Sequence, residues 1–79
     1  MGLKKILKEE RKSVFVGDSL HYRGGGFESD CEAEVTVELR NPNSCVVVVN
    51  KIVSQGTKST IKIGDKIATG WENLWVVEH

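Results

Sequence analysis

The chain has 79 residues, and its eleven Lys and Arg balance its eleven Asp and Glu, so the formal net charge is zero. Hydrophobic residues make up 39% of the chain, and with the 8 glycines they reach the usual share of a globular protein, which excludes general disorder. The longest apolar run, Cys45 to Val49, is too short to cross a bilayer, and no apolar stretch follows the basic N-terminus. We therefore expect one small cytoplasmic domain without membrane contact.

The N-terminal residues 2–12 have helical spacing. Leu3, Ile6 and Leu7 fall on one face at i, i+3 and i+4, and charged residues fill the rest. This pattern predicts a short amphipathic helix, although a segment of this length is marginal on its own and a flexible arm is the alternative. The predicted domain organisation is thus a helix or arm over 1–12 and a single β-barrel-like domain over 13–79.

Residues 31–40 alternate between apolar side chains at odd positions and polar ones at even positions, which predicts a half-buried strand. A turn over 41–44 follows, and then a second β-branched run over 45–53. A turn centred on Pro42 and Asn43 predicts these strand pairs: Leu39–Val46, Val37–Val48, Val35–Asn50, Glu34–Lys51 and Ala33–Ile52. Cys31 and Cys45 then lie at opposite ends of the hairpin, too far apart for a disulfide.

Two segments, 14–20 and 61–67, share the pattern apolar-x-apolar-Gly-Asp-x-apolar. Glycine supplies a positive φ, and aspartate can bond to nearby backbone, so Gly-Asp between short apolar runs is a turn signal. The similarity is consistent with an internal duplication that creates two equivalent sites, or with two strand pairs that need the same turn chemistry.

Short strands are expected along the rest of the chain, near 13–16, 20–23, 59–63, 66–69 and 74–78. With the two strands above, they predict a mainly β fold, a small antiparallel SH3-like barrel or sandwich of five to seven short strands. The 54–58 linker is too short for the helix that an OB-fold carries between its third and fourth strands, so the SH3-like alternative is favoured.

No catalytic motif is present, and neither the two cysteines nor the histidines His21 and His79 have metal-binding spacing. We therefore expect a protein that is not an enzyme and that needs no metal or cofactor.

Charge is segregated along this neutral chain. Residues 28–38 carry five acids and no base, whereas 1–12 carry five bases against two acids and 51–66 carry four bases against one acid. Separate acidic and basic faces can steer a charged partner. The candidate residues for a protein partner are the acids of the 31–40 strand and a tryptophan expected to be exposed in a turn: Glu32, Glu34, Glu38 and Trp71. Alternatively, Lys51 and Lys62 neutralise the acids.

A glycine-rich stretch, 22–27, carries two aromatics and an arginine, a combination that can stack on unpaired bases. With the lysines of 58–66 it gives the candidate nucleic-acid residues: Tyr22, Arg23, Phe27, Lys58, Lys62 and Lys66. The alternative is a plain hairpin connection whose aromatics return to the core.

Together these features favour a non-catalytic binding module that acts through protein–protein contacts, as an inhibitor or regulator of a larger macromolecule. Single-stranded nucleic-acid (RNA) binding is the first alternative. A structural subunit that self-associates into a homo-oligomer through an exposed edge strand is the second.

Overall fold

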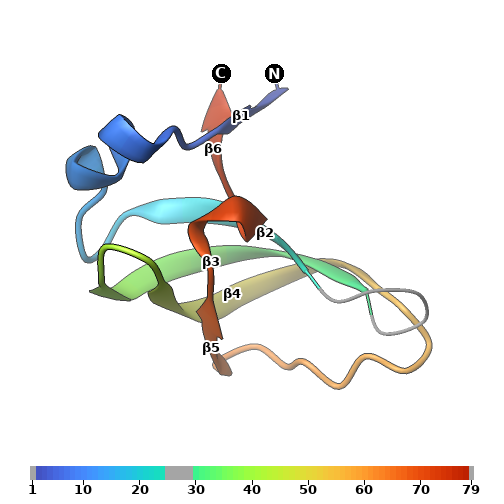
Figure 1. Ribbon diagram of the computed structural model, residues 1–79. Helices are drawn as coiled ribbons and strands as arrows, with labels where there is room; N and C mark the ends of the chain where they lie inside the picture. The colour runs from blue at the N-terminus through green and yellow to red at the C-terminus, as the bar shows by residue number, and fades with distance from the viewer. Residues whose placement is uncertain (1, 25–29, 79) are drawn as a thin grey trace.

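The computed structural model describes residues 2–24 and 30–78. They form a mainly β fold, one open sheet of six antiparallel strands in the order β1-β6-β2-β3-β4-β5. The strands are β1 Gly2–Lys5, β2 Ser19–Gly24, β3 Cys31–Arg40, β4 Cys45–Gln55, β5 Lys66–Thr69 and β6 Leu74–Glu78. Two short 3₁₀ helices complete the fold, η1 Lys8–Ser13 and η3 Trp71–Asn73. Figure 1 shows the two terminal strands, β1 and β6, side by side at one end of the molecule and β5 at the other.

The β3–β4 hairpin is the centre of the sheet. The odd positions of β3 from Cys31 to Val37 are buried and all its even positions are exposed or half-buried, as the alternation predicts. Leu39 departs from the pattern and is exposed. The pairs Glu34–Lys51, Ala33–Ile52 and Leu39–Val46 are confirmed. Hairpin formation therefore follows from local sequence.

The predicted register is wrong in the middle of the hairpin. Val37 pairs with Val47 instead of Val48, and Val35 pairs with Val49 instead of Asn50. One extra residue in β3, Glu38, and one in β4, Asn50, produce these two shifts, and a second extra residue in β4, Val53, shifts the pairs of Glu32 and Cys31. The physical reason is that a bulge turns the following side chains to the other face.

The bulge at Asn50 keeps a polar amide out of the apolar core. In the plain register Asn50 would face Val35, which is fully buried. In the structure Asn50 is exposed, and its Nδ2 donates a hydrogen bond to Oγ1 of Thr36. Val47 and Val49 are buried in its place.

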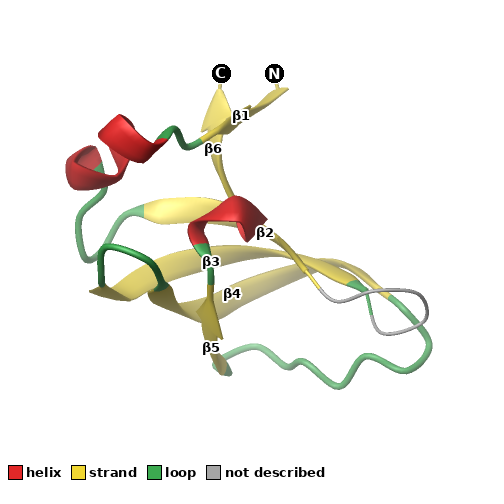
Figure 2. Ribbon diagram, in the orientation of Figure 1, coloured by secondary structure: helices red, strands yellow, loops and turns green. Residues whose placement is uncertain are grey.

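The predicted N-terminal amphipathic helix over 2–12 is absent. Residues 2–5 form edge strand β1, which pairs with β6, and the six residues of η1 form a 3₁₀ helix (Figure 2). Pairing with a strand 70 residues away in sequence contributes backbone hydrogen bonds that a short isolated helix cannot match, since such a helix is marginal in water. Of the predicted apolar stripe only Ile6 is buried, whereas Leu3 and Leu7 are exposed.

The strands predicted at 13–16 and 59–63 are also wrong, because each of these segments leads into a turn. In the first turn the amide of Asp18 donates to the carbonyl of Phe15, and in the second the amide of Asp65 donates to that of Lys62. The central glycines have positive φ, 98° at Gly17 and 93° at Gly64. The repeated sequence pattern therefore has a repeated conformation.

The two turns also bind the sheet in the same way. Gly17 N and Asp18 O bond to Val37 of β3, and Gly64 N and Asp65 O bond to Val49 of β4, with all four N···O distances between 2.7 and 2.9 Å. Each outer side of the hairpin thus receives the same pair of backbone hydrogen bonds from a Gly-Asp turn, at Val37 on β3 and at Val49 on β4.

One cluster of buried side chains forms the core, and all six strands except β1 and β5 contribute large apolar residues to it. Its members are Ile6, Val14, Leu20, Tyr22, Cys31, Ala33, Val35, Val37, Cys45, Val47, Val49, Trp71 and Leu74. The two cysteines are buried and not bonded to each other, as predicted.

Candidate binding pocket at the junction of η1 and the hairpin turn

The helix η1 separates its charged side chains because it is a 3₁₀ helix. With three residues per turn, residues i and i+3 lie one above the other. Lys8 and Arg11 therefore share one side of η1, and Glu10 and Ser13 share another. The surrounding surface reflects this division, since the first pair lines a basic pocket and the second pair lines a separate hollow beside β2 and β6.

An arginine at the end of β3 fastens η1 to the hairpin. Nη1 of Arg40 donates to the carbonyl oxygens of Arg11, Lys12 and Val14 at 3.3, 2.9 and 2.6 Å. In return, Nη1 of Arg11 donates to the carbonyl oxygen of Pro42 at 3.2 Å. Both guanidinium groups thus bond to neutral carbonyls, which leave their positive charges uncompensated.

The buried tryptophan of η3 closes this junction from the third side. Nε1 of Trp71 donates to the carbonyl oxygen of Asn41 at 2.9 Å, and the guanidinium carbon of Arg11 lies 5.9 Å from the centre of its ring. The result is an open pocket of about 380 Å³, a size found for small ligands and side chains. We call this the basic pocket; its lining residues are Lys8, Arg11, Lys12, Arg40, Asn41, Pro42 and Trp71.

The basic pocket carries four cations and no carboxylate in its lining. Within 2–24 and 30–78, none of these four side chains forms an ion pair. Elsewhere on the surface, by contrast, Lys66 pairs with Glu38 at 2.8 Å and Arg23 with Glu32 at 3.0 Å. Four like charges in one hollow repel one another and create a strong local positive potential on a neutral protein.

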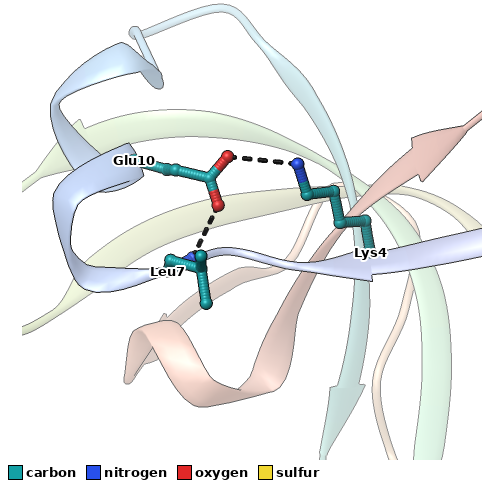
Figure 3. Close-up of polar contacts among 3 residues, drawn as sticks. All are labelled: Lys4, Leu7 and Glu10. Atoms are coloured by element: carbon teal, nitrogen blue, oxygen red, sulfur yellow. Dashed lines mark hydrogen bonds and ion pairs between the residues drawn. The ribbon is translucent and has the colours of Figure 1, made fainter.

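The one half-buried acid of η1, Glu10, is not in the lining of the basic pocket and bonds to Lys4 and Leu7 (Figure 3). Its Oε2 accepts from Nζ of Lys4 at 3.3 Å, and its Oε1 accepts from the backbone N of Leu7 at 3.1 Å. These bonds, the backbone one first, lower the pKa of Glu10 below its usual value, so the carboxylate is ionised at neutral pH. We call the three residues Lys4, Leu7 and Glu10 the latch.

An exposed apolar turn adjoins the basic pocket. The guanidinium carbon of Arg40 lies 5.5 Å from the ring centre of Phe15, which is 60% exposed, and the next residue, Val16, is 65% exposed. The turn is fixed because Oδ2 of Asp18 accepts from the backbone N of Phe15 at 2.9 Å. An apolar turn held by hydrogen bonds therefore lies beside the basic pocket.

The sequence prediction placed Trp71 on the surface, and this is wrong. Trp71 is 1% exposed, because η3 folds it against the hairpin turn, where Asn41 supplies the hydrogen-bond partner that a buried indole N–H needs. It contributes to the basic pocket as buried floor and not as an exposed anchor.

The acids predicted to meet a protein partner lie at separate positions along β3, and two of them, Glu32 and Glu38, form ion pairs. Glu32 contacts both His21, at 3.3 Å, and Arg23. Glu34 lies opposite Lys51 in the sheet, and Glu38 pairs with Lys66 rather than with the expected Lys62. This distribution follows the alternative in which neighbouring bases neutralise the acidic strand.

Five of the six predicted nucleic-acid residues lie in the described part of the chain, and they differ in exposure. Tyr22 is buried, and burial, followed by the nearby Cys31, raises the pKa of its phenol. Arg23 is paired with Glu32, and Phe27 lies outside the described residues. The three lysine candidates are exposed and lie in the 56–65 segment and at the start of β5: Lys58, Lys62 and Lys66.

Sequence reasoning missed the four cations of the basic pocket as a site. The excess of bases in 1–12 was a signal for Lys8, Arg11 and Lys12. No local pattern pointed to Arg40, which reaches the pocket only because the hairpin turn packs against η1.

The potential metal ligands and the two thiols of the described chain lie outside the lining of the basic pocket. No group of three or more His, Cys, Asp or Glu side chains there is placed to hold a metal ion. Burial raises the pKa values of the Cys31 and Cys45 thiols, which disfavours the reactive thiolate.

Comparison of the chain with protein-family models, with curated proteins and with solved structures found no match. The described residues form no helix with the length and hydropathy required to span a membrane.

Proposed function

We propose that this protein is a non-catalytic binding module whose basic pocket holds an acidic segment of a partner protein. The observation that carries the proposal is the gathering of four cations from η1 and β3 without a carboxylate partner among the residues described. A small module of this kind acts by occupying a surface of a larger macromolecule, as a regulator or inhibitor does.

The surroundings of the pocket favour a segment that is both acidic and apolar. The pocket floor is apolar where Trp71 and Pro42 line it, and the exposed Phe15 and Val16 extend the apolar surface beyond its rim. Carboxylates would meet Lys8 and Lys12, and an adjacent apolar side chain would cover the turn. Burial of that apolar side chain would add affinity that charge alone does not supply.

A phosphate-bearing strand would also be attracted by the positive potential, but the arrangement suits it less well. Single-strand binding uses a basic groove with successive exposed aromatic platforms. Here Tyr22 and Trp71 are buried, which leaves Phe15 as the exposed aromatic beside the pocket in the described chain. The protein segment is therefore the better occupant.

The finer fold assignment is part of the same proposal: we infer that the open sheet curls as an SH3-like barrel. β2, β3 and β4 separate β5 from β6 in the sheet, yet only the short η3 segment joins these two strands in sequence, which supports this curl. The Trp71–Asn41 bond between η3 and the hairpin turn supports it as well. An experimental structure with a flat sheet, its core open on one side, would contradict the assignment.

The test is a titration of the protein with a fluorescently labelled peptide rich in Glu and Leu, in parallel with labelled single-stranded RNA. We expect peptide binding that Lys8→Glu weakens by about tenfold or more, as charge reversal in a basic site does. Lys62→Glu, the same charge change on an exposed turn outside the pocket, should weaken it far less.

Three outcomes would overturn the proposal. Equal loss in both variants would show that binding follows net charge and not the pocket. Tighter binding of RNA, with loss in Lys62→Glu, would favour the nucleic-acid alternative. A native mass that doubles at working concentration, without peptide binding, would favour self-association.

A further inference from the structure

The basic pocket depends on which way η1 presents its side chains. In a 3₁₀ helix Lys8 lies above Arg11, and both line the pocket. In an α-helix Lys8 would instead align with Lys12, and Arg11 with Leu7, since 3.6 residues make a turn. Lys12 also lines the pocket, so the conformation of these six residues sets how Lys8 and Arg11 are placed beside Lys12.

The latch holds the start of η1 in this conformation. The backbone N of Glu10 donates to the carbonyl oxygen of Leu7 at 2.9 Å, an i+3 bond, and Oε1 of Glu10 accepts from the N of Leu7. The side chain thereby closes a ring around the first turn of η1, and Lys4 ties that ring to β1 (Figure 3).

We propose that Glu10 is the positioning residue of the basic pocket: its bonds to Leu7 and Lys4 aim Lys8 and Arg11 into the pocket and keep the Glu10 carboxylate out of it. This inference rests on the proposed function, because it assigns the control of that same site. It predicts that removal of a negative charge at Glu10 weakens the binding of an acidic ligand, although simple electrostatics predicts the opposite.

Glu9 supplies a matched control in the same helix. It is exposed, has no hydrogen-bond or ion-pair partner among the described residues, and differs from Glu10 by one position. The substitutions Glu9→Ala and Glu10→Ala change the net charge and the side-chain length equally. Only the second removes the latch.

The experiment titrates each variant with the Glu- and Leu-rich peptide at neutral pH. We expect Glu9→Ala to bind as tightly as the unmodified protein or slightly more tightly. Glu10→Ala should bind about threefold to tenfold more weakly, the range of coupling between contacting residues. Glu10→Gln, whose amide oxygen can still accept from Leu7 N, should fall between Glu10→Ala and the unmodified protein.

The result that overturns the inference is tighter or unchanged binding in Glu10→Ala, equal to that of Glu9→Ala. Failure of the proposed function looks different, because then the unmodified protein does not bind the peptide or Lys8→Glu has no effect. If Glu10→Ala does not fold, the comparison of Glu10→Gln with Glu9→Gln decides. In both, backbone amide shifts of Lys8 and Arg11 report whether η1 keeps its conformation.

Discussion

At the scale of single residues, the two tryptophans differ in whether their indole N–H has a partner. Nε1 of Trp71 bonds to Asn41, whereas Nε1 of Trp75 is buried without a hydrogen-bond partner among the described residues. Lys5 lies over the Trp75 ring at 5.8 Å and covers it. The Trp71 indole therefore holds the hairpin turn by a hydrogen bond, whereas the Trp75 indole contributes mainly buried apolar surface area.

We predict that Trp71→Phe lowers the free energy of unfolding by about 1–3 kcal/mol, because the carbonyl of Asn41 loses its donor and the core loses volume. Trp75→Phe is the control and should cost less, since it removes an N–H that makes no bond. Denaturant titration of both variants measures the difference. A larger loss in Trp75→Phe would show that the two indoles have been assigned the wrong roles.

At the scale of elements, the two Gly-Asp turns make matching backbone bonds on opposite sides of the hairpin. Gly17 and Gly64 both have positive φ, and a Cβ added at either one meets no atom within 4 Å. The cost of a side chain there is therefore conformational and not steric.

We predict that Gly17→Ala and Gly64→Ala each destabilise the protein by about 1–2 kcal/mol, the cost of a left-handed backbone for an L-residue. The two losses of unfolding free energy should agree closely, because both turns make the same set of backbone hydrogen bonds to the hairpin. Urea unfolding of each variant provides the measurement. A difference of more than about 1 kcal/mol would mean that the turns are alike in sequence but not in energetic role.

Elements whose partners are close in sequence were predicted best. The alternation of 31–40 and the turn at Pro42 gave the hairpin, and the Gly-Asp signals gave both turns. The bulge at Asn50 was not predictable from a register that is counted from the turn alone. It depends on which residue of β4 is too polar to be buried in the core. β1 was missed because its partner β6 lies at the other end of the chain.

The candidate site was predictable only in part for the same reason. The basic character of η1 is written in residues 1–12, but the pocket needs Arg40, Pro42 and Trp71 from distant parts of the chain. Trp71 looked exposed because its hydrogen-bond acceptor, Asn41, is 30 residues away. When a site is assembled by tertiary packing, sequence patterns reveal only those of its residues that are close together in the chain.

At the scale of the whole molecule, the basic pocket concentrates like charges that would be more stable apart. A protein with zero net charge has enough acids to neutralise them, yet no acid lines the pocket, and some pair elsewhere, as Glu38 does with Lys66. Binding surfaces often retain such unfavourable arrangements because their function requires them.

We predict that Lys12→Glu raises the free energy of unfolding by up to about 1 kcal/mol, since it relieves repulsion at an exposed position, while it weakens binding of the acidic peptide. Added salt should reduce both effects, because it screens exposed charges. Denaturant and peptide titrations at low and high salt test this. Loss of both stability and binding would mean that Lys12 stabilises the fold instead of destabilising it.

The open sheet has two ends, β1 and β5, whose outer backbone groups are free of strand partners in the described chain. Unpaired edges recruit other strands and promote aggregation, and a protein with a calculated pI of about 6.7 has little net repulsion to prevent this near neutral pH. Both edges carry lysines, Lys4 and Lys5 on β1 and Lys66 on β5. Stacking a second sheet against either edge would strip water from these ammonium groups. The lysines thus oppose fibre growth at the edges themselves. The net charge of the molecule, which is zero, supplies no general repulsion between copies.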